Sequence, residues 1–492
     1  MNYRFVFKTL GNLLLIEAFL LLFPLGIAIY NNEKTLPFIF TIILLIILGS
    51  LFSLIKSKRK DYFAKEGLLI TTLSWVLLSI FGAIPFVLDG AIPNYIDALF
   101  ETVSGFTTTG SSILTDVEAL SKGLLFWRSF THFIGGMGIL VFAMAIIPMS
   151  NDNSMHMIKA EVPGPFPGKL LPKMSDTAKW LYGIYITLTL IEIILLCIGG
   201  MPLFDSILTS FGTAGTGGFG IKNTSIAFYN SAYIEYIVGI FMLLFGINFN
   251  VFFFIIMKKF KLAFSNEEMK SYLIIIATSV ILITLNILSM CTNIAEAFRL
   301  SFFQVSTVIT TTGYSTTDFN LWPTFSKMIL FILMFFGACG GSTGGGIKIS
   351  RIVILFKKLY YDIVALVHPR AVKTIKFENK KLNDKTVNAI GYYILLNIAI
   401  IGIFTLLISL ENYDFETTLT SVVSCINNIG PGLGLTGPMG NFSIFSPVAK
   451  LLLSTLMLLG RLELYPLLLF LSPAFYEKNK NLNKHKKRLR NS

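Results

Sequence analysis

The fold is decided by a short string, Phe106-Thr-Thr-Thr-Gly110, and by its near copy, Ile309-Thr-Thr-Thr-Gly313. Two further strings align with these on one glycine, Gly215-Thr-Gly-Gly218 and Ile426-Asn-Asn-Ile-Gly430. A single string of this kind is most simply a helix C-cap, with glycine just past the helix end. Four strings, each preceded by a short apolar segment and flanked by long apolar ones, instead favour re-entrant loops in a membrane.

The composition supports a membrane protein. The chain is 54% hydrophobic and 14% charged, whereas a soluble domain is about one quarter charged. Leu68–Leu88, Tyr272–Cys291 and Val387–Leu410 contain no Asp, Glu, Lys or Arg, and each is long enough to cross a bilayer as a helix. We expect further spanning helices near 8–30, 37–55, 123–148, 178–199, 232–257, 324–355 and 447–473.

The predicted fold is therefore an all-α polytopic membrane protein with ten transmembrane helices. From residue 61 onward, a helix, a pore loop and a second helix recur in four pseudo-fourfold repeats, and a helix pair precedes them. The expected divisions are 1–60 for the N-terminal pair, 61–150, 151–260, 261–360 and 361–476 for the four repeats, and 477–492 for a basic tail.

The charges predict how the chain is oriented. The net charge is +13, but basic clusters follow every second predicted crossing, as in the positive-inside rule, and do not indicate a nucleic-acid partner. Both termini are accordingly expected in the cytoplasm. The basic tail, Lys478–Arg490, is suited to anionic membrane lipid.

The loops have the composition of an ion filter. Backbone carbonyls that all point inward can replace the hydration shell of a cation, and glycine tolerates the backbone this requires. Threonine can add a hydroxyl, and each preceding short helix directs its partly negative C-terminus at the centre. The predicted ion-coordinating residues are Thr108, Thr109, Gly110, Thr216, Gly217, Gly218, Thr311, Thr312, Gly313, Asn428, Ile429 and Gly430.

A glycine-rich stretch, Gly337–Gly346, interrupts the helix expected over 324–355. A phosphate-binding loop is one reading, but Ile347 separates the glycines from Lys348 and the spacing is wrong. Close helix packing through small residues is another. We favour an unwound gate below the filter. The predicted gate residues are Gly340, Gly341, Ser342, Thr343, Gly344, Gly345, Gly346, Lys348 and Arg461.

Three charged or titratable side chains stand out within predicted spans. A charge at the depth of Arg461 needs a partner or water, so it either pairs with a carboxylate such as Glu463 or lines the cavity under the filter. For Arg128 and His132 we expect interfacial snorkelling.

The four strings, together with Gly337–Lys348 and Gly460-Arg-Leu-Glu463, resemble the membrane subunit of the Trk/Ktr/HKT superfamily of potassium transporters, and the N-terminal helix pair resembles its Trk type. The resemblance implies potassium as the transported ion, which Gly110 favours over sodium. It also implies an arginine barrier at Arg461, a gate at the glycine-rich stretch and a prokaryotic cell (inner) membrane. The implied partners are a second copy of the chain and a cytosolic ring of RCK-type regulatory subunits, which alone would bind nucleotide.

Other functions fit less well. A sodium-permeable pore or a symporter coupled to sodium or protons remains the alternative. A secondary transporter of an organic solute would not need four loops of one orientation. An enzyme is not expected, because the sequence has no HExxH motif and its four histidines are far apart. No bound cofactor is predicted.

Overall fold

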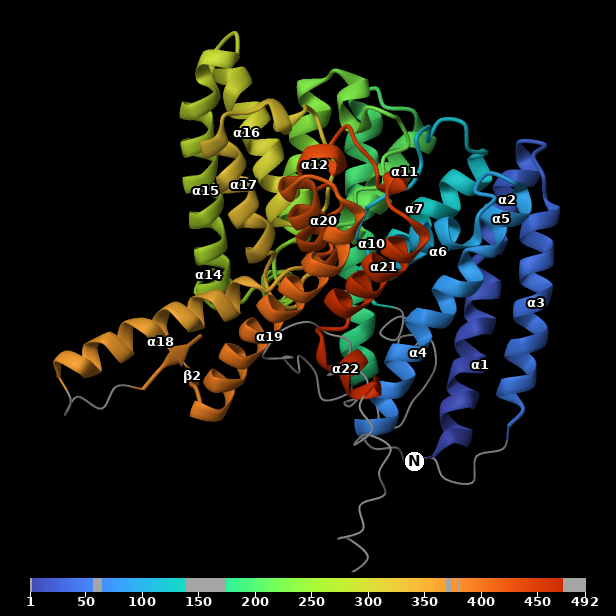
Figure 1. Ribbon diagram of the computed structural model, residues 1–492, viewed down its shortest axis with the longest axis horizontal. Coiled ribbons are helices and arrows are strands. Elements are labelled where there is room, and N and C mark those ends of the chain that lie inside the picture. The colour runs from blue at the N-terminus through green and yellow to red at the C-terminus, as the bar shows by residue number, and fades with distance from the viewer. Residues whose placement is uncertain (1, 56–63, 139–173, 369–373, 379, 472–492) are drawn as a thin grey trace, which may run out of the picture.

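The computed structural model describes residues 2–55, 64–138, 174–368, 374–378 and 380–471, and this part of the chain is almost entirely helical (Figure 1). The long α-helices are α1 (Tyr3–Leu20), α3 (Leu36–Ser53), α4 (Ala64–Gly82), α10 (Met174–Ile198), α15 (Glu267–Ile287), α18 (Ile349–Val367) and α19 (Asp384–Ile408). The shorter ones are α2 (Leu22–Tyr30), α5 (Ile84–Asp89), α6 (Tyr95–Phe106), α7 (Lys122–Gly136), α11 (Leu203–Gly215), α12 (Ala232–Phe245), α13 (Phe249–Ile256), α14 (Phe260–Phe264), α16 (Ile294–Ile309), α17 (Thr324–Phe336), α20 (Phe415–Asn427), α21 (Pro447–Arg461) and α22 (Tyr465–Leu471).

Short 3-10 turns and one hairpin complete the described part. The turns are η1 (Ser225–Tyr229), η2 (Leu288–Met290), η3 (Phe319–Leu321), η4 (Ser409–Glu411), η5 (Gly434–Thr436) and η6 (Phe442–Ile444). The hairpin pairs β1 (Lys376–Phe377) with β2 (Lys380–Lys381) in antiparallel register, Lys376 opposite Lys381.

Within the described residues, six helical stretches are long and apolar enough to cross a membrane without interruption: Tyr3–Tyr30, Leu36–Ser53, Lys65–Asp89, Asp176–Ile198, Glu267–Met290 and Asp384–Glu411. They correspond to the predicted N-terminal pair and to the predicted first helix of each repeat. An all-helical polytopic membrane fold is thereby confirmed.

The second helices differ from the prediction, because the structure breaks them. The continuous helix expected over 232–257 is wrong, since α12 and α13 meet at 92°. The one expected over 447–473 is also wrong, since Glu463 and Leu464 have positive φ between α21 and α22. α17 ends at Phe336, where the interruption was predicted. α7 ends at Gly136, and the rest of the helix expected over 123–148 lies largely outside the described residues.

Glycines explain why these helices come so close to the short ones before breaking. A Cβ added to Gly135 would lie within 3.0 Å of the Phe106 carbonyl oxygen, and one added to Gly460 would do the same at Ile426 O. Phe106 and Ile426 occupy the same position, four residues before the loop glycine, in repeats one and four. The second helix therefore touches the C-terminal end of the short helix through bare backbone.

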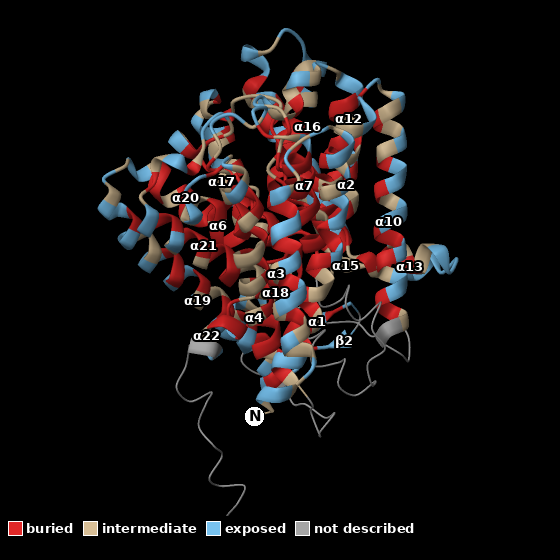
Figure 2. Cartoon of the chain, turned by 90° about the vertical axis from the view of Figure 1, so that its right-hand side faces the viewer, coloured by how far each residue is buried: buried red, intermediate tan, exposed pale blue. Residues whose placement is uncertain are grey.

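Burial follows the arrangement of the helices. Figure 2 shows the buried residues gathered around the central helices such as α6, α7 and α21, while α10 at the periphery presents exposed side chains. The exposed side chains on outer helices include large apolar ones such as Leu190 and Ile194 on α10 and Ile281 and Leu285 on α15. Apolar outward faces suit helices whose surroundings are lipid tails.

Candidate functional site

Four short helices, α6, α11, α16 and α20, lead into the four loops. Three of them begin at a side-chain cap: Asn94, Asn293 and Asp414 each accept a hydrogen bond from an amide of their own first turn. Each of the four helices is followed within two residues by a residue of positive φ, which stops the helix before it could span.

The loops share one backbone conformation. Two positions have positive φ in every loop: Thr108, Thr216, Thr311 and Asn428 at 55°, 53°, 58° and 55°, and then Gly110, Gly218, Gly313 and Gly430 at 82°, 70°, 93° and 106°. Positive φ at every second residue turns successive carbonyls toward one side of the chain. The fourth loop adopts this conformation although its sequence has no threonine at these positions.

The loops close into a ring. A Cβ added to each of these glycines would lie within 3.0 Å of a carbonyl oxygen in another loop. The contacts are Gly110 with Gly217 O, Gly218 with Thr312 O, Gly313 with Ile429 O and Gly430 with Thr109 O. The order runs from loop one to two, three, four and back to one. At each step the residue before the glycine contributes the oxygen, so the predicted filter residues are brought together around one axis.

A polar cavity of about 140 Å³ opens on one side of this ring. Its lining includes all four loop glycines, together with Ser111, Ser315, Arg128 and Asn223. We call this cavity the vestibule. Its position makes the ring accessible to water from that side.

The hydroxyls of the loops are largely turned into their walls. Thr107 and Thr109 share a hydrogen bond of 2.8 Å between hydroxyls, and Thr310 and Thr312 repeat it at 2.8 Å. In the fourth loop, Asn428 Nδ2 donates to Thr109 Oγ1 at 2.9 Å and to Met457 O at 3.0 Å. Asn428 therefore braces two neighbouring elements with its side chain.

The glycine-rich loop 337–348 lies against the ring on the side opposite the vestibule. The Gly345 amide donates to Thr311 Oγ1 at 2.6 Å, and the Gly346 amide donates to Asn427 O at 3.0 Å. The buried Lys348 side chain donates to Gly344 O within the same loop. The glycine-rich loop is thus hydrogen-bonded to loops three and four of the ring.

Other contacts tie the first half of this loop to the α12–α13 bend. The Cys339 amide donates to Gly246 O at 3.0 Å, and the Phe249 amide donates to Gly341 O at 3.1 Å. A Cβ on Gly341 would lie 3.2 Å from Asn248 Oδ1. The glycine-rich loop thus packs against the bend in the second helix of repeat two.

Arg461 reaches the loop from α21. Its guanidinium donates to Thr343 O at 3.1 Å, to Gly136 O at 2.7 Å and to Gly135 O. Glu463, one carboxylate suggested as its partner, pairs with Arg351 of α18. Arg461 therefore joins the loop to the C-terminal end of α7.

The sequence reasoning missed a buried ion pair behind the ring. Arg128 Nε lies 2.6 Å from Glu101 Oε1, with side chains only 3% and 1% exposed. Glu101 also accepts the Ile113 amide at 3.0 Å, and Arg128 Nη1 donates to Gly220 O at 2.8 Å. The pair links loops one and two. A carboxylate inside the apolar segment before Phe106 was the available signal.

The expected snorkelling of Arg128 and His132 is wrong for the same reason. Both side chains are buried, and His132 meets the Phe219 ring edge-on at 4.1 Å between centroids. A Cβ on Gly217 would lie within 3.0 Å of His132 Nδ1. Both residues pack directly behind loop two, against the ring of Phe219.

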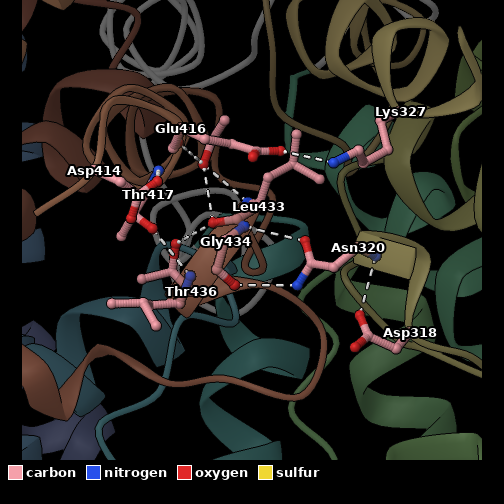
Figure 3. A network of polar contacts seen from close by, with 11 residues as sticks. Asp318, Asn320, Lys327, Asp414, Glu416, Thr417, Leu433, Gly434 and Thr436 are labelled. Carbon is pink, nitrogen blue, oxygen red and sulfur yellow. Dashed lines mark hydrogen bonds and ion pairs between the residues drawn. The ribbon is translucent and has the colours of Figure 1, made fainter. Parts of the chain in front are cut away.

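A second polar network, shown in Figure 3, fixes the vestibule rim between repeats three and four. Asn320 donates through Nδ2 to Gly434 O and accepts through Oδ1 from the Gly434 amide, both at 3.1 Å. Thr417 Oγ1 accepts the Leu435 amide at 3.0 Å, and Lys327 pairs with Glu416 at 3.3 Å. Side chains here supply the hydrogen-bond partners that the loop backbone does not find within the loop itself.

The fold and this site define a polytopic membrane protein in which four re-entrant loops of one chain surround a common axis. Residues 35–479 match the family described as "TrkH: Cation transport protein", and the chain belongs to this family. It is a family of transporters, not of enzymes.

Relatives align over nearly the whole chain. The chain is 35% identical to the "Trk system potassium uptake protein TrkH" of Salmonella typhimurium, with 97% of this chain and 100% of the relative covered. It is 34% identical to the "Trk system potassium uptake protein TrkG" of Escherichia coli, with 96% and 98% covered. The crystal structure of "the Potassium Transporter TrkH from Vibrio parahaemolyticus" superposes with a TM-score of 0.87 at 30% identity, covering 97% and 100%.

Proposed function

We propose that the chain takes up potassium across a bacterial cell membrane as the membrane subunit of a Trk system. Membership of the family and the names of the relatives support the transported ion. The finer proposal is that the ring is a selectivity filter, and that loop 337–348 with Arg461 is its gate.

One observation carries the filter. A Cβ added to each of the four glycines would meet a carbonyl oxygen of the next loop, in cyclic order, so backbone oxygens from all four loops lie together around one centre. Such a ring can replace the water around a monovalent cation without any charged side chain. The vestibule on one side supplies hydrated ions, and the C-terminal ends of α6, α11, α16 and α20 add partial negative charge on the other.

The gate rests on contacts around the glycine-rich loop. Gly345 and Gly346 donate to loops three and four, so an ion leaving the ring meets this loop first. Arg461 holds the loop through Thr343 O and places a positive charge beside the path. In this arrangement the pore is closed, and opening requires that these hydrogen bonds break.

The orientation and the partners are also proposals. Basic clusters after every second crossing place both termini, and with them the gate side, in the cytoplasm. The expected partners are a second copy of the chain and a cytosolic ring of RCK-type subunits, which alone would bind nucleotide. The four repeats would keep the divisions expected from the sequence.

Flux into liposomes tests the proposal. Vesicles containing the purified chain would be loaded with potassium, and uptake of potassium, rubidium and sodium tracers would be compared with and without a membrane potential. We expect potassium and rubidium to enter faster than sodium, and to follow the potential. Equal rates for sodium would remove the potassium filter, and a sodium or proton requirement would favour the symporter alternative.

A further inference from the structure

One carboxylate oxygen holds both ends of the glycine-rich loop. Glu268 Oε1 accepts the Gly340 amide at 2.7 Å, near the start of the loop, and the Ser350 amide at 2.9 Å, in the first turn of α18. The Glu268 side chain is 3% exposed. A buried carboxylate that accepts amide hydrogen bonds makes stronger contacts than a neutral acceptor would.

The two residues before Glu268 contact the hairpin. Asn266 Nδ2 donates to Glu378 Oε1, and the Glu378 amide donates to Glu267 Oε2 at 3.3 Å. Glu267 also pairs with Lys357 of α18, whose Nζ donates to Lys376 O at 2.9 Å. Three successive residues at the start of α15 therefore hold the hairpin on one side and the loop on the other.

Resting on the proposed gate, we propose that Glu268 is a positioning residue that keeps the loop closed and passes movements of the hairpin to it. The hairpin strand β2 lies in the lower part of Figure 1, toward the same end of the molecule as the N-terminus. Its Lys376, Lys380 and Lys381 are exposed and fit an acidic surface on a cytosolic protein. A pull on the hairpin displaces residues 266–268 and removes the acceptor from Gly340 and Ser350.

Cys339 provides a built-in reporter of this movement, because it lies in the loop, is fully buried and is a free thiol. The other cysteines, Cys197, Cys291 and Cys425, would first be replaced by alanine. The rate at which a small water-soluble thiol reagent modifies Cys339 would then be measured alongside potassium flux and the unfolding temperature.

Glu268→Ala leaves two buried amides without their acceptor. We expect Cys339 modification and flux each to rise about tenfold, since hydrogen bonds to charged groups correspond to at least an order of magnitude in population. Glu268→Gln keeps an acceptor and loses the charge, so its rise is smaller, and it carries the test if the alanine variant does not fold. Glu296→Ala, at a partly exposed glutamate in the first turn of α16, is the control and changes neither rate.

The hairpin is tested by a double-mutant cycle. Glu378→Ala alone raises both rates, and in the Glu268→Ala background it adds nothing, because the path through residues 266–268 is already cut. Additive effects, or no effect of Glu378→Ala, would overturn the coupling. Unchanged rates in both Glu268 variants would overturn the proposal that Glu268 keeps the glycine-rich loop closed.

Potassium flux in Arg461→Ala shows whether a negative result concerns the role of Glu268 or the proposed gate itself. If it raises flux while the Glu268 variants do not, the gate stands and the role of Glu268 is wrong. If neither it nor the Glu268 variants raise flux, the gate proposal fails as well.

Discussion

At the scale of single residues, both the space around the loop glycines and their positive φ angles require glycine at these positions. Gly110 has a φ of 82°, and a Cβ there would overlap Gly217 O in the next loop. Gly110→Ser therefore incurs strain of about 1–3 kcal/mol before any clash is counted. We expect potassium flux to fall about tenfold or more, because each 1.4 kcal/mol in a barrier is tenfold in rate, and the preference over sodium to weaken.

Gly402→Ser provides the comparison, since nothing lies within 4 Å of a Cβ at Gly402. That variant should transport like the parent in the same tracer assay. If both serine variants lost flux equally, the ring would not be the cause.

Arg461 makes a separate prediction. Arg461→Ala removes its hydrogen bonds to Thr343 O, Gly135 O and Gly136 O, and flux should rise about tenfold, since one charged hydrogen bond is worth about 1.5–3 kcal/mol. Arg461→Lys decides how the arginine acts. A lysine retains the positive charge but cannot make the same set of guanidinium hydrogen bonds. Low flux in Arg461→Lys would therefore indicate that the charge itself is the barrier, and high flux would indicate that the hydrogen bonds hold the loop closed.

At the scale of elements, the glycine-rich loop should behave as one closing unit. Removing Gly344–Gly346 takes away the amides that reach Thr311 and Asn427, and we expect higher basal potassium flux in liposomes with little change in ion preference. Flux equal to that of the parent would contradict a gate. Reduced ion preference would mean that the loop also shapes the filter.

The short helix α20 carries a pH-dependent cap. Asp414 accepts the Thr417 amide at 2.9 Å, and hydrogen bonds from Thr417 lower the pKa of this exposed carboxyl. A lowered folded-state pKa means that the stabilisation is complete above the unfolded pKa and is lost as pH falls through the folded one. Asp414→Ala should cost about 1 kcal/mol at neutral pH.

The difference in unfolding free energy between parent and Asp414→Ala should thus stay constant above about pH 5 and shrink below it. Asp414→Asn keeps a cap that does not titrate, so it should follow the parent at neutral pH. A difference that stayed constant at acid pH would exclude the carboxylate as the source.

At the scale of elements, the sequence predicted the features whose pattern lies within one short stretch of residues. The first helix of each repeat is a long uncharged run, and the loops carry repeated Thr-Gly strings, so both were predictable. The breaks at Gly246 and after Gly460 were not, because one glycine in an apolar helix is equally compatible with close packing. Glu268 was missed because its partners are 72 and 82 residues away in the sequence.

At the scale of the whole molecule, the ring is unequal. A Cβ on Gly430 would stand 2.9 Å from Thr109 O, whereas a Cβ on any of the other three loop glycines would lie closer to its carbonyl oxygen. For single Gly→Ala variants at Gly110, Gly218, Gly313 and Gly430, we expect the smallest loss of potassium flux at Gly430. The four tracer rates, normalised to protein in the membrane, provide the order. A larger loss at Gly430 than at Gly110 or Gly218 would contradict the geometry.

The cyclic order itself was beyond prediction from sequence. Four matching strings indicate four loops, but they do not say which carbonyl faces which glycine. The bracing of Thr109 by Asn428 spans 319 residues, and the Glu101–Arg128 pair bridges two repeats through Gly220. Such contacts depend on how the repeats pack against one another, and no periodic pattern in the sequence indicates that packing.

Four loops encoded in one polypeptide also respond to mutation differently from four identical copies of one loop. In a homotetramer, one codon change appears on every side of the axis, and its damage is multiplied by four. Here a mutation touches one quadrant, while the other three keep their shape. That independence accounts for a bracing Asn428 where loops one and three have threonine, and it lets selectivity be adjusted in small asymmetric steps.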